Sequence, residues 1–448
     1  MRRAERAVLV GIVVAVAIAL RWGFVAMAHV PNPLRVDAGE YAQCAYNLVE
    51  HGVYSTSTQL PPLPDSFRSP GYPLLLALCR VVGGTSHWMS LALWLQVALG
   101  GLTVLLCYRL ARACLGFLPA LSAALLCALS PHLVVSSGYF LTECWTTFVL
   151  TTGLWLVSVA TARGVLHAAL AGLVLGFAVL CNETLVFVPF VVVFALWRTL
   201  GRARAITLLL CAMLPFALWT VRNQSQTLAR TGSERMTASI SHGSYPGMVF
   251  QDPRLVGFPY REDPEQPAFG SSWENLRTVL AGRIAADPWR YASWYLLEKP
   301  LWLWRWNLVQ GNGVLVYDVS NNPYDSQAVV AATGALMRWL HVPCMGLAAL
   351  GATWFLFRRR TPALLRAIAG LAIFGTLAYL PVIPDPRYLQ PFRPLLFVLG
   401  PAVLAALVAG VLQRTRGNKR EDNSSAENGG QIFQLGLPVS SRTAPPSS

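Results

Sequence analysis

The chain has 448 residues, of which 54% are hydrophobic and only 12% are charged, and its formal net charge is +14 at pH 7. Soluble domains carry about 25% charged residues, so this composition excludes an ordinary soluble protein. Apolar runs of about 20 residues recur and no alternating strand pattern is sustained, which predicts an all-α, polytopic integral membrane protein. The basic residues lie mostly between the apolar runs, so they indicate membrane topology, and no nucleic-acid partner is predicted.

The first apolar run covers residues 7–29 and follows a basic N-terminal stretch. We predict a transmembrane helix here. A cleaved signal peptide is the alternative, because Ala26-Met27-Ala28 resembles a cleavage site, although Arg21 interrupts the run. Both interpretations place residue 37 outside the cytoplasm.

Nine further spans bring the predicted total to about ten transmembrane helices. Two other apolar stretches fit a span poorly: residues 71–82 are too few, and residues 291–308 carry Glu298, Lys299 and Arg305 among several tryptophans. We expect both to be juxtamembrane helices on the outer surface, because tryptophan favours the headgroup level. The nine predicted spans are residues 87–110, 115–134, 139–160, 166–180, 184–199, 205–221, 336–357, 363–383 and 394–412.

The distribution of basic residues supports this topology with the N-terminus in the cytoplasm. The two shortest outer turns, residues 135–138 and 181–183, contain no lysine or arginine. Residues 30–86 and 222–337 are then large extracytoplasmic loops of a transmembrane domain covering residues 1–412. The Ser- and Asn-rich segment 413–448 is predicted to be a disordered cytoplasmic tail. The arginines of the predicted cytoplasmic connections are Arg109, Arg112, Arg163, Arg198, Arg202, Arg204, Arg358, Arg359, Arg360 and Arg366.

Polar motifs gather at the predicted outer ends of the helices. Asp37, Glu40 and Tyr41 would share one helical face, since residues at i, i+3 and i+4 lie together. An interfacial helix with an acidic first turn is the alternative interpretation. The other motifs are Arg68-Ser69-Pro70-Gly71-Tyr72-Pro73, Leu141-Thr142-Glu143, Asn182-Glu183, Arg222-Asn223 and Asp385-Pro386-Arg387-Tyr388.

Acidic residues and arginines at one face of the membrane are suited to a transfer reaction in which a group leaves a lipid-linked phosphate. Arginine binds phosphate bidentately, and a carboxylate within hydrogen-bond reach can act as base on an attacking hydroxyl. For Arg222, Arg387 and Lys299, simple snorkelling to the interface is the alternative. The nine cysteines form no C-x-x-C motif, so we predict neither a disulfide framework nor a metal site.

The ordered motifs resemble the GT-C superfamily of lipid-linked-sugar glycosyltransferases, in the branch of protein O-mannosyltransferases and the lipid A aminoarabinose transferase (glycosyltransferase family 39-like). The resemblance covers roughly residues 1–400. It rests on Asp37-x-x-x-Tyr41-x-x-x-Ala45-x-Asn47-Leu48, Gly52-x-Tyr54-Ser55, Arg68-x-Pro70-x-Tyr72-Pro73-Leu74, Gln96, Leu141-Thr142-Glu143, Arg222-Asn223 and Arg387-Tyr388.

The resemblance implies transfer of a sugar from a polyprenyl-phosphate donor to a lipid, glycan or protein acceptor, with inversion and outside the cytoplasm. Asp37 would be the base, and Glu143 would orient a sugar hydroxyl or hold an arginine. No metal or cofactor is expected, because cationic side chains alone can stabilise the leaving phosphate. The expected substrate-binding residues are Glu40, Tyr41, Arg68, Arg222, Lys299, Arg387 and Tyr388.

Two positions depart from the resemblance. Many relatives carry an acid directly after the loop aspartate, where this chain has Ala38. A frequent Thr-Arg-Pro sequence after the fifth span is here Cys181-Asn182-Glu183, which removes an expected cation.

Two other function classes stay open from the sequence. A transporter or flippase would carry charged residues near the bilayer midplane, where this chain has almost none. A glycan ligase or polymerase of another fold would also use arginines at the outer face. The expected location is the bacterial inner (plasma) membrane.

Overall fold

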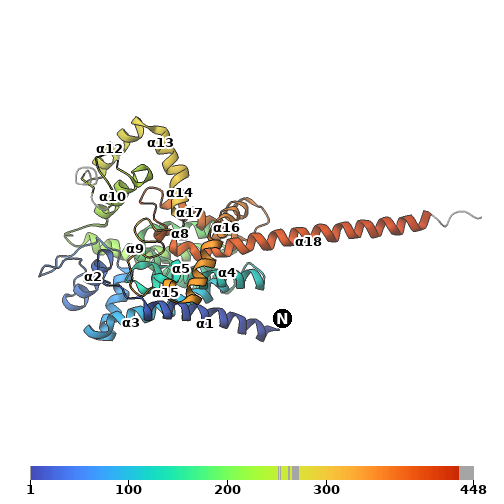
Figure 1. Ribbon diagram of the computed structural model, residues 1–448, viewed down its shortest axis with the longest axis horizontal. Coiled ribbons are helices and arrows are strands. Elements are labelled where there is room, and N and C mark those ends of the chain that lie inside the picture. The colour runs from blue at the N-terminus through green and yellow to red at the C-terminus, as the bar shows by residue number, and fades with distance from the viewer. Residues whose placement is uncertain (1, 251, 253, 261–262, 265–271, 433–448) are drawn as a thin grey trace, which may run out of the picture. The chain divides into compact units, whose positions relative to one another are not determined.

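The computed structural model describes all residues except 1, 251, 253, 261–262, 265–271 and 433–448. The described residues form helices and loops, with isolated bridges and no strand (Figure 1), which confirms the all-α fold class. The helices are α1 (Arg3–Met27), α2 (Asp37–His51), α3 (Gly71–Arg112), α4 (Phe117–Leu129), α5 (Pro131–Val135), α6 (Thr142–Arg163), α7 (Val165–Cys181), α8 (Val188–Leu200), α9 (Arg202–Gln224), α10 (Gly232–Gly243), α12 (Trp273–Ala286), α13 (Pro288–Ser293), α14 (Lys299–Leu303), α15 (Pro323–Ser326), α16 (Ala328–Phe357), α17 (Ala363–Ala378) and α18 (Arg393–Ile432). Short 3-10 turns cover Ser136–Gly138, Glu183–Phe187, Pro246–Met248 and Pro386–Phe392, and Trp294–Glu298 is a π-turn.

Seven helical segments of the described residues are long and apolar enough to cross a membrane. An eighth is the pair Phe117–Leu129 and Pro131–Gly138, which is bent by 56°. Two further spans expected from the sequence correspond to α7 and α17, which are apolar but shorter. The chain is therefore an integral, multi-pass membrane protein, as predicted.

The helix α3 contains a break that the sequence indicates. Gly84 has φ of 62° and ψ of −169°, which is accessible to glycine and costly for other residues. The break separates the stretch predicted to lie at the membrane surface, residues 71–82, from the predicted span 87–110. Residues 291–308 form α13, the π-turn and α14, and none of these is among the candidate spans.

Small residues let the spans α7 and α9 approach closely. A Cβ added to Gly172 or Gly176 of α7 would collide with the backbone carbonyls of Leu208 and Ala212 on α9. The spacing is the small-xxx-small pattern of packed transmembrane helices. This contact fixes the helical wall from which Cys181-Asn182-Glu183 emerges.

The chain divides into two compact units, Met1–Pro401 and Ala402–Ser448. The division lies near the predicted boundary at 412, but α18 continues through residues 413–432, within the segment predicted to be disordered. Residues 433–448 lie outside the described residues. Every cavity described below is lined by residues of the first unit.

Candidate active site

A cavity of about 310 Å³ lies where the N-terminal ends of α2, α3 and α6 meet the turn Pro386–Phe392. It is lined by residues of α2, of the segment just before α3, of α6 and of the turn, together with residues of α10 and of the segment that follows α7. Six of the nine predicted site residues are among them: Asp37, Tyr41, Arg68, Glu143, Arg387 and Tyr388.

Carboxylates and guanidinium groups alternate along one wall of this cavity. Arg68 donates from Nη2 to Asp37 Oδ1 at 2.6 Å, and Arg387 Nη2 lies 3.1 Å from Asp37 Oδ2. Arg387 also donates from Nε to Glu143 Oε1, and Arg68 lies 2.5 Å from Glu40 Oε2. Asp37 is therefore held between two arginines that come from distant parts of the chain.

The first turn of α2 presents its acids as the sequence predicts. Asp37 and Glu40 both reach Arg68, and the Arg68 guanidinium lies 5.1 Å from the centre of the Tyr41 ring. Tyr41 in turn packs edge-on against Tyr72, with ring centres 5.6 Å apart. The shared helical face of these residues is thus confirmed.

The rigid segment after Arg68 is fixed by close backbone packing. Tyr54 donates a hydrogen bond to the Arg68 carbonyl at 2.9 Å. A Cβ on Gly71 would lie 2.5 Å from Cys181 Sγ, so only glycine permits this approach of α3 to the end of α7. The prolines and glycine of this motif therefore set the position of Arg68.

Arg387 is held by the backbone of its own turn. The buried carboxylate of Asp385 accepts from the Arg387 N–H at 2.9 Å and from the Gln310 N–H at 2.7 Å. The Arg387 side chain is only 7% exposed. Interfacial snorkelling does not describe this arginine, because its guanidinium is buried against Asp37 and Glu143.

The two arginines control the protonation of Asp37. Burial alone would raise the pKa of Asp37, but the guanidinium groups of Arg387 and Arg68 outweigh it and lower the pKa to about 2. With its partners in place, this carboxylate is ionised and is a weak base. Its basicity would increase if either guanidinium moved to another anion.

A second ion pair, between Glu183 and Arg235, also lines the cavity. Glu183 accepts from Arg235 Nη2 at 2.9 Å and from Ser69 Oγ at 2.8 Å, and Asn182 donates to the Tyr379 hydroxyl at 2.7 Å. Arg235 lies on α10, in the large outer loop. A cation beside the segment after the fifth predicted span thus comes from α10, which the sequence motifs did not indicate.

Arg222 does not line this cavity. It donates to the carbonyls of Asp65 at 2.7 Å and Tyr54 at 3.2 Å, and its guanidinium packs 4.9 Å from the Trp219 ring. It borders a separate cavity of about 620 Å³ whose other walls are mostly apolar, with Leu74 and Leu180 among them. Arg222 thus marks the polar edge of an apolar groove beside the main cavity.

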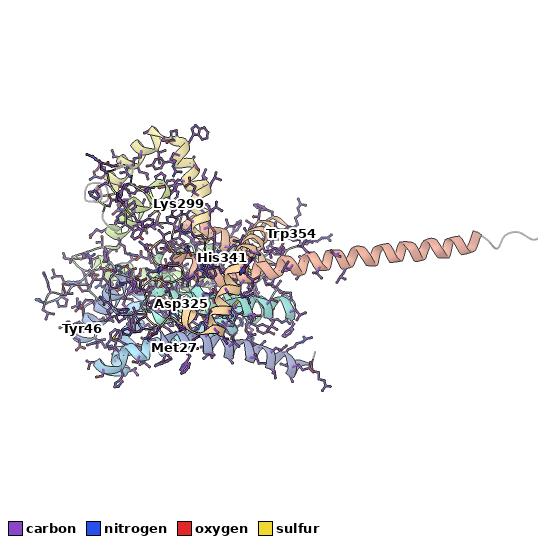
Figure 2. The ribbon with its side chains drawn as sticks, in the orientation of Figure 1. Met27, Tyr46, Lys299, Asp325, His341 and Trp354 are labelled. Carbon is purple, nitrogen blue, oxygen red and sulfur yellow. The ribbon has the colours of Figure 1, made fainter. Side chains whose placement is uncertain are left out.

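Lys299, at the start of α14 (Figure 2), also lies outside the cavity. Its ammonium donates to the carbonyls of Leu380 and Val382, the second at 2.9 Å, and packs 4.3 Å from the Tyr295 ring. Burial lowers the pKa of Lys299 to about 6. These bonds join α14 to the segment after α17, and a role of Lys299 in binding a phosphate stays a prediction.

Asp37 and Arg387 also border a further cavity, of about 750 Å³. The two residues and Gln310 line both this cavity and the one described first. The remaining walls are polar for the most part and include Arg35, Tyr317 and Asp318, with Arg35 packed 4.5 Å from the Tyr317 ring. The predicted base therefore faces two separate spaces.

No group of three or more His, Cys, Asp or Glu side chains gathers as a metal site in the part of the chain that the structure describes. The absence of a metal requirement stays a prediction.

Two solved membrane proteins are among the structures to which this chain is similar. AglB, an oligosaccharyltransferase from Archaeoglobus fulgidus solved with an inhibitory peptide and a dolichol-phosphate, is 14% identical, with a TM-score of 0.49 over 93% of this chain and 52% of that one. ArnT from Cupriavidus metallidurans, solved with undecaprenyl phosphate, is 16% identical, with a TM-score of 0.49 over 88% of this chain and 60% of that one. The chain thus spans only half to three fifths of these proteins. No curated protein sequence matches it.

One family model matches part of the chain directly. Residues 57–250 match the family described as oligosaccharyl transferase STT3, N-terminal. The matched region contains Arg68, Glu143, Glu183 and Arg235, which all line the first cavity. The match covers less than half of the chain, and it shows a similarity to that family over the region that contains these four residues.

Proposed function

We propose that this protein is a membrane glycosyltransferase that moves a sugar from a polyprenyl-phosphate carrier to an acceptor hydroxyl at the extracytoplasmic face, with inversion. The observation that carries the proposal is the position of Asp37, which lies between Arg68 and Arg387 and borders two cavities. The match of residues 57–250 to a transferase family supports the same class of reaction.

The donor phosphate would bind in the 310 Å³ cavity, where Arg68, Arg387 and Arg235 are available. Each of these arginines is paired with a carboxylate. A phosphate therefore competes with Asp37 for Arg68 and Arg387. Binding of the donor would draw the guanidinium groups away from Asp37 and make this carboxylate a stronger base at the moment when a base is needed.

The acceptor would approach from the 750 Å³ cavity on the other side of Asp37. Inversion requires the attacking oxygen and the leaving phosphate on opposite faces of the anomeric carbon, which two cavities sharing Asp37 allow. The acceptor oxygen forms the new bond to the anomeric carbon, and its proton passes to Asp37. The bond from that carbon to the phosphate oxygen breaks, and its electron pair leaves on the phosphate, stabilised by the arginines.

Glu143 would act by holding Arg387. Its carboxylate is buried and accepts from Arg387 Nε. It thereby fixes the guanidinium that faces both Asp37 and the donor space, a positioning role.

The lipid chain of the donor would lie in the apolar groove beside the main cavity. Pro70 and Leu180 of the groove are direct neighbours in sequence of Ser69 and Cys181 of the cavity. The groove therefore offers an apolar path along the lipid-facing helices, and Arg222 lies at its polar edge.

The decisive experiment gives purified protein a radiolabelled polyprenyl-phosphate sugar and a membrane extract, with an Asp37→Asn variant in parallel. Transfer by the wild type, lost in the variant at unchanged thermal stability, supports the proposal. Equal transfer by both proteins would remove Asp37 from the mechanism. Movement of the donor across the membrane without a new glycosidic bond would instead identify a flippase.

A further inference from the structure

A second groove lies at the other end of the helical bundle, where α1, α3 and the start of α4 come together. It has a volume of about 700 Å³ and is separate from every residue assigned to sugar transfer. The part of α3 after Gly84 extends for about 40 Å at 1.5 Å per residue, so its C-terminal end at Arg112 is one membrane thickness away from the break. The predicted topology places this groove at the cytoplasmic face.

Four arginines line this inner groove: Arg3 and Arg6 on α1, and Arg109 and Arg112 on α3. None of the four forms an ion pair with a carboxylate of the described residues, whereas Glu5 is taken by Arg2. The four positive charges therefore converge on one space without a counter-charge from the surrounding described chain.

The rest of the inner groove is apolar. Val10, Val14 and Leu105 line its walls, and Gly11 leaves open space where a side chain would otherwise lie. The neighbouring side chains of Val8 and Ile12 are 61% and 53% exposed, as expected for a helix that faces lipid. The inner groove therefore has an apolar part within the membrane and a cationic end formed by the four arginines. This combination fits a molecule with a hydrocarbon tail and an anionic head.

We infer that the inner groove binds one anionic phospholipid, with its phosphate among the four arginines and an acyl chain along α1 beside Gly11. The positive-inside rule accounts for arginines in cytoplasmic loops, but it does not require them to line one groove. Basic pockets between transmembrane helices at the cytoplasmic face are suited to anionic lipid headgroups. The inference is independent of the proposed sugar transfer.

The test uses the purified full-length protein and native mass spectrometry, with phosphatidylglycerol and phosphatidylcholine of identical acyl chains as probes. The Arg3→Gln/Arg109→Gln variant removes two charges whose side chains make no recorded hydrogen bond. The Arg359→Gln/Arg360→Gln variant removes two exposed charges from another predicted cytoplasmic connection and serves as the matched control.

We expect the wild type and the control to retain one phosphatidylglycerol in preference to phosphatidylcholine. The Arg3/Arg109 variant should bind it at least about tenfold more weakly, since each basic residue near a membrane surface contributes about 1 kcal/mol to binding of anionic lipid. Equal losses in both variants, or equal retention of the two lipids by the wild type, would overturn the inference.

A second variant separates a bound lipid from a bound phosphate. Gly11→Leu fills the apolar part of the inner groove without a change in charge, and nothing lies within 4 Å of the position where its Cβ would be. It should weaken binding of phosphatidylglycerol, and excess glycerol phosphate should not displace the lipid from the wild type. Unchanged binding in Gly11→Leu, or displacement by glycerol phosphate, would show that the arginines hold only a small anion.

Discussion

At the scale of single residues, the pairing of Asp37 with two arginines keeps its carboxylate ionised and bears on its proposed role as the base. An inverting transfer needs a carboxylate that is ionised before the reaction and basic during it. Arg68 and Arg387 keep Asp37 ionised before the reaction. If the two guanidinium groups moved to a bound phosphate, Asp37 would become more basic. The same residues would thereby bind the donor and activate the base.

Replacing Asp37 tests this role directly. We expect Asp37→Asn to reduce the rate of sugar transfer by about 10²–10⁴-fold, the contribution typical of a general base. The control is Glu50→Gln, which removes an acid from the far end of α2, where Glu50 forms an ion pair with Arg80. A similar loss of transfer in Glu50→Gln would point to α2 as a whole and not to the base.

The depressed pKa of Asp37 also predicts a dependence of stability on pH. Its folded-state pKa of about 2 lies below the usual aspartate value of 3.8, so ionised Asp37 stabilises the folded state above pH 3.8. The contribution, about 2 kcal/mol, should be lost as the pH falls from 3.8 through 2.

The corresponding measurement is the melting temperature of wild type and Asp37→Asn between pH 6 and 2. The difference between the two proteins should shrink as the pH falls. A constant difference over the whole range would show that the ion pairs of Asp37 do not stabilise the fold.

At the scale of elements, a buried arginine supports the broken span formed by α4 and α5. The carbonyl of Cys127 would bond to the N–H of residue 131 in a continuous helix, but residue 131 is proline and has no N–H. Arg21 of α1 donates to the carbonyls of Cys127 at 3.4 Å and Ala128 at 3.3 Å instead. Arg21, which interrupts the first apolar run of the sequence, is thus a hydrogen-bond donor to the C-terminal end of α4.

We therefore expect Arg21→Met to destabilise the protein by about 1–3 kcal/mol, because the helix end loses charged hydrogen-bond donors. The check is the melting temperature in the same detergent. Val16→Met on the lipid-facing side of α1 is the control, since Val16 is 37% exposed. A melting temperature that is unchanged in Arg21→Met would show that the carbonyls find other donors.

The contact between α7 and α9 gives a second prediction at this scale. Gly176→Leu should lower stability by about 1–3 kcal/mol, because its side chain would collide with the carbonyl of Ala212. Gly346→Leu on α16 introduces the same change where nothing lies within 4 Å, and it should be tolerated. Equal melting temperatures for the two variants would contradict the close packing.

At the scale of the whole molecule, the proposal depends on which face of the membrane carries Asp37. A cysteine at exposed position 58, in the loop before Arg68, should react with a membrane-impermeant maleimide added to intact cells. A cysteine at Arg359 should react only after the membrane is opened. The reverse pattern would place the predicted active site in the cytoplasm.

Most of the fold can be predicted from the sequence because the hydrocarbon core of a membrane permits few backbone structures. Long apolar runs must become helices, since lipid offers no partners to backbone groups. The recurrence of long apolar helices and the break near Gly84 are predictable for this reason. Helical periodicity predicts the common face of Asp37, Glu40 and Tyr41. Six of the nine site residues predicted from local motifs line the same cavity.

The remaining assignments depended on contacts between segments that are far apart in the chain. Local sequence patterns do not predict such contacts. Arg235 lies in a loop without a motif, yet the packing of α10 places it on Glu183. Arg222 and Lys299 have the right charge, but backbone carbonyls hold them outside the cavity. Hydrophobicity thus determined the helices and their order, while only tertiary packing decided which charges meet, because an ion pair depends on distances that no sequence period specifies.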